Sequence, residues 1–305
     1  MINKYSIAAG SALLILSLLF IGSNQMQAQD LIAEGAKPEM ITEGHQFTEG
    51  PYWNPAGFLL YSDIPANQVY RWAPGEGKSV YLEPSGHSNG ITADTEGRII
   101  LCQHDGRVSR MDNNKNLTVL ASQYNGKRLN SPNDVVVRSD GLIYFTDPPF
   151  GVSEEARELT FSGVYLLGKE GSLTLLYDKF THPNGIVLSP DEQTLYVNDS
   201  RTGSIVKFTV NKDGSLSSPQ DFATVGAMAD NGAADGMVVD MQGRLYSTGP
   251  GGVSVFDPSG KKVGLIEFPD RITNLDWGGK DVSTLFATAP AGIYRLQMNV
   301  KGFKK

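Results

Sequence analysis

One kind of side chain, with an oxygen at its tip, recurs six times along the chain at nearly regular intervals. The series is Glu49, Asn89, Asn133, Asn184, Asp235 and Asn274, with steps of 40, 44, 51, 51 and 39 residues. It holds two carboxylates and four amides, without a thiol or an imidazole. Such oxygen donors suit a hard cation, and calcium accepts about six to eight of them. The series therefore predicts a cation site, if the fold brings its members together.

Two buried carboxylates held close together repel each other unless a cation neutralises them or one of them binds a proton. Turn chemistry is the alternative explanation, because Asn-Gly and Asp-Gly pairs are common where a side chain hydrogen-bonds its own backbone. Glu49 fits that alternative poorly, since glutamate is a weak mimic of such turns. A residue in the same place in six units also favours the cation site.

Each member of the series opens a unit of short apolar segments separated by turn residues. After Asn184, strand-like runs at 194–198 and 205–208 follow a Pro190-Asp191 turn, and the same order recurs around the other members. Repeats of about 40 to 50 residues with four short strands are typical of propeller blades. We therefore predict an all-β chain folded as a six-bladed β-propeller with four-stranded blades. The innermost strands of a propeller surround its channel, so the six side chains would meet at the channel mouth.

The ends of the chain determine how the ring closes. The last unit ends soon after its third strand, and Glu39–Thr42 precedes the first unit. This N-terminal segment could supply the missing outer strand, which would close the ring and leave no open seam.

The first 28 residues resemble a secretory signal peptide. Lys4 precedes an apolar run over residues 7–21, and Ala28 is a small residue at the predicted boundary. The run is shorter than the roughly 20 residues that span a bilayer, although an uncleaved N-terminal anchor is the alternative. We expect a signal peptide over 1–28, a single propeller domain over 29–305, and an exported protein, periplasmic or secreted, with no stable membrane insertion after cleavage.

Charge and cysteine content exclude other classes of function. The formal net charge is −7 and no basic run occurs, which argues against binding to nucleic acid. Cys102 is the only cysteine, so no internal disulfide can form, and packing or a metal must stabilise an exported chain.

Several motifs together resemble the gluconolactonase, regucalcin and luciferin-regenerating family of calcium-dependent propellers. The resemblance runs from about Glu43 to Leu296. Its motifs are Thr48-Glu49-Gly50-Pro51, Asp63-Ile64-Pro65-Ala66, Ser131-Pro132-Asn133-Asp134, Phe145-Thr146-Asp147-Pro148-Pro149, Pro183-Asn184-Gly185 and Ala234-Asp235-Gly236-Met237. One departure concerns Ser131, because the animal regucalcin branch has an arginine there for binding sugar lactones. That departure puts the substrate in doubt but not the metal.

The resemblance implies a divalent metal, calcium in the first place with Zn²⁺, Mn²⁺ or Mg²⁺ as alternatives. The implied ligands are Glu49, Asn133, Asn184 and Asp235, and Asp235 is also the implied catalytic carboxylate. Four further residues are candidates for binding substrate. Asn89 and Asn274 belong to the series but not to the family ligands, and His104 and Asp199 lie where second strands end near the same mouth.

The resemblance implies a hydrolase of carboxylic ester bonds, a gluconolactonase-like lactonase acting on a small lactone or ester. Asp235 would orient or deprotonate a water molecule, or attack the carbonyl carbon directly. Two alternatives remain open, because one fold hosts many functions. The first is an organophosphate or ester hydrolase on the same scaffold, and the second is a non-enzymatic binding propeller with a structural calcium.

Overall fold

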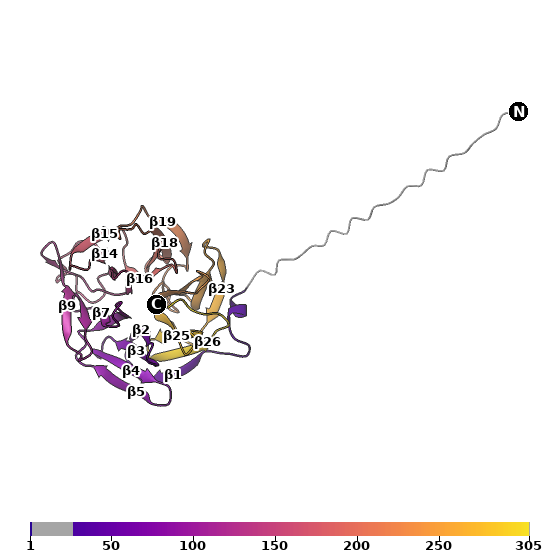
Figure 1. Cartoon of the computed structure of the whole chain (residues 1–305), viewed down its shortest axis with the longest axis horizontal. Helices are drawn as coiled ribbons and strands as arrows, with labels where there is room; N and C mark the ends of the chain where they lie inside the picture. The colour runs from indigo at the N-terminus through magenta and orange to yellow at the C-terminus, as the bar shows by residue number, and fades with distance from the viewer. Residues whose placement is uncertain (2–26, 305) are drawn as a thin grey trace.

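The computed structural model describes Met1 and residues 27–304, so most of the predicted signal peptide lies outside the described residues. Six four-stranded antiparallel sheets stand around a central axis, as Figure 1 shows. The six-bladed propeller predicted from the repeats is therefore confirmed, with four strands in every blade.

The blades follow one another along the chain, each starting with its innermost strand. The first is β2 (Thr48–Asn54), β3 (Phe58–Asp63), β4 (Gln68–Ala73) and β5 (Gly77–Leu82). The second is β6 (Ser88–Ala93), β7 (Ile99–Gln103), β8 (Arg107–Met111) and β9 (Leu117–Ala121), and a small hairpin follows it, β10 (Gln123–Tyr124) with β11 (Lys127–Arg128). The third is β12 (Val135–Val137), β13 (Ile143–Asp147), β14 (Gly163–Leu167) and β15 (Leu173–Tyr177).

The remaining three blades repeat this order. The fourth is β16 (Pro183–Leu188), β17 (Thr194–Asp199), β18 (Ser204–Thr209) and β19 (Gln220–Thr224). The fifth is β20 (Met237–Val239), β21 (Leu245–Gly249), β22 (Gly252–Phe256) and β23 (Lys262–Glu267). The sixth is β24 (Asn274–Gly278), β25 (Thr284–Ala289), β26 (Gly292–Gln297) and, outermost, β1 (Glu39–Glu43).

Strand β1 closes the ring as predicted. It pairs antiparallel with β26, and Glu39 lies opposite Arg295, with which it forms an ion pair of 2.9 Å. The last blade therefore joins both ends of the described chain, and its outer edge is covered.

The core lies between the blades, where large aromatic side chains pack from one sheet onto the next. Trp53 of the first blade stacks on Phe286 of the sixth, with ring centroids 5.0 Å apart. Trp277 of the sixth blade is fully buried and meets Tyr246 of the fifth edge-on at 5.2 Å. Such contacts bury large apolar areas. They hold neighbouring inner strands at fixed separations around the tunnel.

Three aspartates at the ends of second strands tie down the loops that lead into inner strands. Asp63 accepts hydrogen bonds from the backbone N–H groups of Gln46 and Phe47. Asp147 accepts one from the N–H of Asn130, and Asp199 accepts two from the N–H groups of Thr181 and His182. The five distances are 2.7–3.2 Å. A carboxylate that accepts backbone N–H groups orders the segment that donates them. These loops precede Glu49, Asn133 and Asn184, so the aspartates position the series.

The continuous described segment, which starts at residue 27, begins beside the fifth and sixth blades. A short 3-10 helix, η1 (Ala28–Leu31), contacts β23, and both Ala28 and Leu31 are fully buried. Ala28 is the residue after which we predict cleavage, and that site stays a prediction. None of the helices among the described residues has the length and apolar character needed to cross a membrane.

Candidate active site

The six residues of the series are buried at one end of the inner strands. Each of these residues is only 3% to 6% exposed. Glu49, Asn89 and Asn184 are the second residues of β2, β6 and β16, and Asn274 opens β24. Asn133 and Asp235 lie two residues before β12 and β20. The series therefore occupies one level around the tunnel, as its spacing predicted.

Glycines next to the series allow the inner strands to approach one another this closely. Gly90 donates its N–H to the Asn133 carbonyl at 2.8 Å, and Gly236 donates to the Thr273 carbonyl at 2.8 Å. A Cβ at Gly50, Gly90 or Gly185 would collide with the backbone of the next blade. Glycine is required here for close backbone approach rather than for turn formation.

The two carboxylates of the series interact directly. Burial raises the pKa of Glu49 to about 7, and its carboxyl group interacts with the side chains of Asn274 and Asp235. Burial, together with the nearby charge of Glu49, holds the pKa of Asp235 well above its usual range. Such a buried acidic pair favours a bound cation or a bound proton.

Two amide oxygens at the mouth are buried without a hydrogen-bond partner in the described structure, Oδ1 of Asn89 and Oδ1 of Asn184. The Asn184 amide is oriented by its nitrogen, which donates to Ser200 Oγ at 3.0 Å, while Ser200 donates to the Ala234 carbonyl at 2.7 Å. Buried acceptors are rarely left unpaired. The free oxygen of Asn184, beside Asp235, is therefore placed to bind a ligand.

The donor set fits a hard cation. Among residues 27–304, no three histidines, cysteines, aspartates or glutamates gather as a metal-binding group. The candidate site therefore rests on two carboxylates with asparagine oxygens, a set that suits calcium better than zinc. Glu49, Asn133, Asn184 and Asp235 are the residues that would hold it. Asn274 differs from Asn184, because its Oδ1 already accepts the Leu275 N–H at 2.7 Å.

His104 lies beside the series, as predicted for a substrate-binding residue. Its Nε2 is 3.1 Å from the amide nitrogen of Asn89. Burial lowers the pKa of His104 to about 4, so the imidazole is uncharged at neutral pH. It can offer a hydrogen bond there, but it carries no proton to donate as an imidazolium.

Asp199 is held by the protein itself. Both of its carboxylate oxygens accept hydrogen bonds, from Thr181 and His182 on one side and from Arg201 on the other. The structure thus gives this aspartate a positioning role, and substrate binding by Asp199 stays a prediction. Ser131, where the animal branch has arginine, donates to the Pro148 carbonyl at 2.6 Å and holds the loop after β13.

Sequence reasoning did not single out three residues at or below the mouth. Arg271 lies three residues before Asn274, with Nη2 3.8 Å from Asp235 Oδ2. Ser200 directly follows the end of β17, as His104 follows the end of β7, and that shared position could have drawn attention to it. Asp134 stands where four other units have glycine, which was also visible in the aligned repeats.

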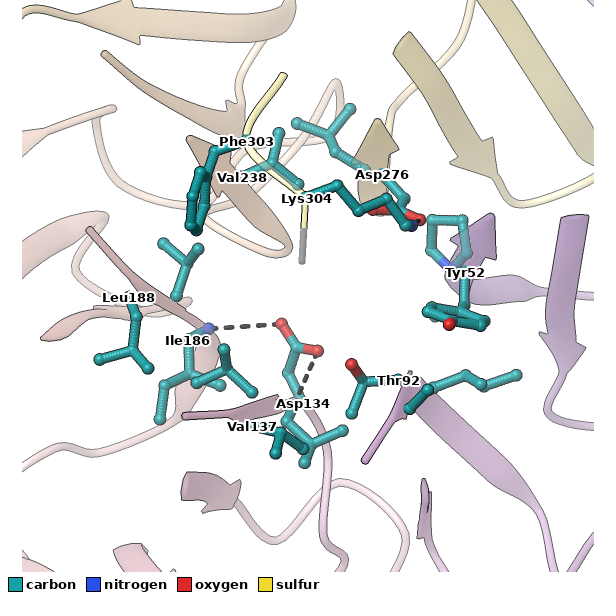
Figure 2. A pocket seen from close by; sticks show the side chains of 18 of the residues that line it. Tyr52, Thr92, Asp134, Val137, Ile186, Leu188, Val238, Asp276, Phe303 and Lys304 are labelled. Carbon is teal, nitrogen blue, oxygen red and sulfur yellow. Dashed lines mark hydrogen bonds and ion pairs between the residues drawn. The ribbon is translucent and has the colours of Figure 1, made fainter. Parts of the chain in front are cut away.

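Asp134 faces a cavity of about 690 Å³ (Figure 2). Residues of the inner strands line it, and Asn274 is the one member of the series among them. Its carboxylate accepts the N–H of Val135 at 2.9 Å and of Ile186 at 3.3 Å. Lys304 forms an ion pair with Asp276, and both residues line the same cavity. None of the four predicted ligands lines this cavity. The cavity and the predicted ligands are therefore distinct, and the unpartnered oxygens of Asn89 and Asn184 belong to the series rather than to the cavity lining.

Comparison with known proteins agrees with the geometry. The family described as "SMP-30/Gluconolactonase/LRE-like region" matches residues 47–291. A gluconolactonase of Zymomonas mobilis is 35% identical, with 90% of this chain and 85% of that protein covered. A solved gluconolactonase from Xanthomonas campestris is 34% identical with a TM-score of 0.80, covering 90% of this chain and 93% of that one. Regucalcin from Agrobacterium tumefaciens, described as a calcium-binding protein, shares the fold at 22% identity and a TM-score of 0.74, covering 88% and 96%.

Proposed function

The chain belongs to the SMP-30/gluconolactonase/LRE-like family, and from that premise we propose that it is a metal-dependent lactonase. The observation that carries the proposal is the buried pair Glu49 and Asp235, beside the unpartnered oxygen of Asn184. The 35% identity to a gluconolactonase supports a lactone as the substrate.

Calcium is the cation that we propose, held by Glu49, Asn133, Asn184 and Asp235. Carboxylate and amide oxygens are its usual ligands, and it tolerates irregular geometry better than magnesium does. The calcium-binding relative with the same fold supports this choice. Zn²⁺, Mn²⁺ and Mg²⁺ are alternatives that metal analysis of the purified protein would separate.

The reaction adds water to the lactone carbonyl carbon and breaks the ring ester bond, which yields a hydroxy acid. When bound, the cation supplies positive charge that polarises the carbonyl group. Asp235 accepts the proton of the attacking water and returns it to the ring oxygen as that bond breaks. Direct attack by Asp235 on the carbonyl carbon is the alternative role of the same side chain.

The test compares Asp235→Asn with Asp230→Asn, an exposed aspartate of the same segment. Hydrolysis of γ- and δ-lactones, gluconolactone included, is measured on metal-stripped protein before and after calcium is restored. We expect calcium to restore turnover in the wild type and in Asp230→Asn but not in Asp235→Asn. Full turnover in Asp235→Asn would refute the catalytic assignment.

Two further outcomes would redirect the assignment. Hydrolysis that persists in excess chelator would reject metal dependence. Folded, calcium-loaded protein with no lactone turnover would favour esters or organophosphates as substrates, and then a binding role.

We also propose that the protein is exported, on the strength of the apolar run at residues 7–21. N-terminal sequencing of the mature protein tests that proposal.

A further inference from the structure

Arg271 is held at the mouth by its neighbours in the loop between β23 and β24. Tyr294 donates its hydroxyl to Asp270 Oδ2 at 2.5 Å, and Ile272 is fully buried. The backbone on both sides of Arg271 is therefore anchored. Its guanidinium lies 6.0 Å from the centre of the Phe47 ring, which precedes Glu49 by two residues.

The guanidinium of Arg271 forms a long ion pair with the predicted catalytic carboxylate but no hydrogen bond to it. Nη2 is 3.8 Å from Asp235 Oδ2, which is longer than a hydrogen bond. Nε is buried and has no hydrogen-bond partner among the described residues. About a third of the side chain remains exposed, so a ligand at the mouth can reach it.

Other arginines of the chain show what a structural role looks like. Arg128 donates to the carbonyls of Leu129 and Asn130, and Arg138 donates to Asp140 and to two carbonyls of another loop. Arg138 donates to acceptors of the protein through all three guanidinium nitrogens, and Arg128 does so through both of its terminal nitrogens. Arg271 shows the opposite pattern, with a buried unpaired donor beside the reaction site, which is the pattern of a side chain that bonds a ligand.

Apart from Asn184 Oδ1, which the proposed cation uses, three buried side-chain atoms of the series or of the loops beside it have no partner among the described residues: Asn89 Oδ1, His182 Nδ1 and Arg271 Nε. A mouth with unused donors and acceptors on several sides favours a ligand that carries hydroxyl groups around its ring. A planar guanidinium bridges two neighbouring oxygens with a fixed fork of parallel N–H groups, a geometry that an ammonium group lacks.

We propose that Arg271 determines substrate specificity, because its guanidinium donates hydrogen bonds to ring hydroxyl oxygens of a polyhydroxylated lactone. This inference rests on the proposed lactonase function. Arg271 does not take part in bond breaking. It selects hydroxylated sugar lactones over unsubstituted alkyl lactones of the same ring size.

The test measures kcat/KM of Arg271→Met and Arg271→Lys on glucono-1,5-lactone and on δ-valerolactone, which has the same ring without hydroxyls. A hydrogen bond from a charged group is worth about 10- to 100-fold. We expect the kcat/KM of Arg271→Met to fall by about 10- to 100-fold on gluconolactone and to change little on δ-valerolactone. The kcat/KM of Arg271→Lys on gluconolactone should lie between those of the wild type and Arg271→Met. Arg295→Met, on the third strand of the sixth blade, β26, is the matched control and should match the wild type on both lactones. Calcium titration of each variant verifies that the site is intact.

Equal losses on the two lactones would overturn the specificity role, because they would show that Arg271 acts through Asp235 instead. An Arg271→Met variant that is as active as the wild type, with an unchanged ratio of kcat/KM values on the two lactones, would overturn the specificity role as well. A wild type that opens neither lactone would overturn the proposed function and this inference with it. The first two outcomes leave the lactonase function standing, so the two failures are distinguishable.

Discussion

Gly90 is the residue through which the second blade contacts the third at the level of the predicted ligands. Its N–H donates to the Asn133 carbonyl at 2.8 Å. A Cβ at this position would lie 2.5 Å from that same carbonyl oxygen and 2.9 Å from the Asp134 Cα. Gly90 does not have a positive φ. The backbone conformation at this position is therefore one that alanine can adopt, and the effect of Gly90→Ala comes only from steric overlap with the third blade.

The size of the disturbance follows from these distances. Real Cβ contacts are essentially never shorter than 3.0 Å, so the Asn133 carbonyl must move by at least 0.5 Å, and by 0.9 Å to reach ordinary contact at 3.4 Å. Calcium–oxygen distances span only about 0.3 Å. We expect Gly90→Ala to weaken calcium binding about 10- to 100-fold, as loss of support behind a ligand does. Overpacking should lower the free energy of unfolding by about 1–3 kcal/mol.

Isothermal titration with calcium and urea unfolding in chelator measure the two effects. Gly168→Ala is the matched control, because its Cβ would meet only the Ser172 hydroxyl within 3.4 Å, and that group can rotate away. The control should bind calcium as the wild type does. Wild-type calcium affinity in Gly90→Ala would refute the reasoning that Asn133 is a ligand positioned by this contact.

Two further predictions concern charge. Because burial raises the pKa of Glu49 to about 7, calcium must displace a proton below that pH, and its affinity should fall about tenfold per unit of acidification for each proton released. In metal-free protein this raised pKa makes the contribution of Glu49 to the free energy of unfolding largest below about pH 4.5 and smaller as the pH rises to 7, which urea titrations across that range would detect. Lys304→Met removes the ion-pair partner of the partly buried Asp276 and should cost about 1–2 kcal/mol at pH 8. Asp276→Asn in the same chain should recover most of that loss, and a single variant as stable as the wild type would contradict the prediction.

The repeats allowed the architecture to be predicted from sequence because blade formation is local. Each blade is built from strands adjacent in the chain, and turn residues with strand-forming segments mark them directly. Closure by Glu39–Thr42 could also be predicted, since the last unit lacked an outer strand. The observed strand, Glu39–Glu43, extends one residue further.

The roles of polar residues at the strand ends were harder to predict. Asp63, Asp147 and Asp199 occupy matching positions in three blades, and a sequence shows only that they reach one face. Whether such a carboxylate points toward substrate or accepts backbone N–H groups depends on the loop that packs against it. For Asp199 that loop supplies Thr181 and His182, whose N–H groups it accepts.

The sequence by itself determined the propeller and the order of the oxygen-bearing series, because both depend on a period that is read along the chain. Tertiary structure alone decided which atoms are left without partners. Asn184 is oriented by Ser200, and Asn274 turns its oxygen to its own backbone, although the two residues are alike in sequence. Arg271 approaches Asp235 across a blade boundary. These differences arise from contacts between segments far apart in the chain, and hydrogen-bond saturation and burial are properties of such contacts rather than of residue type.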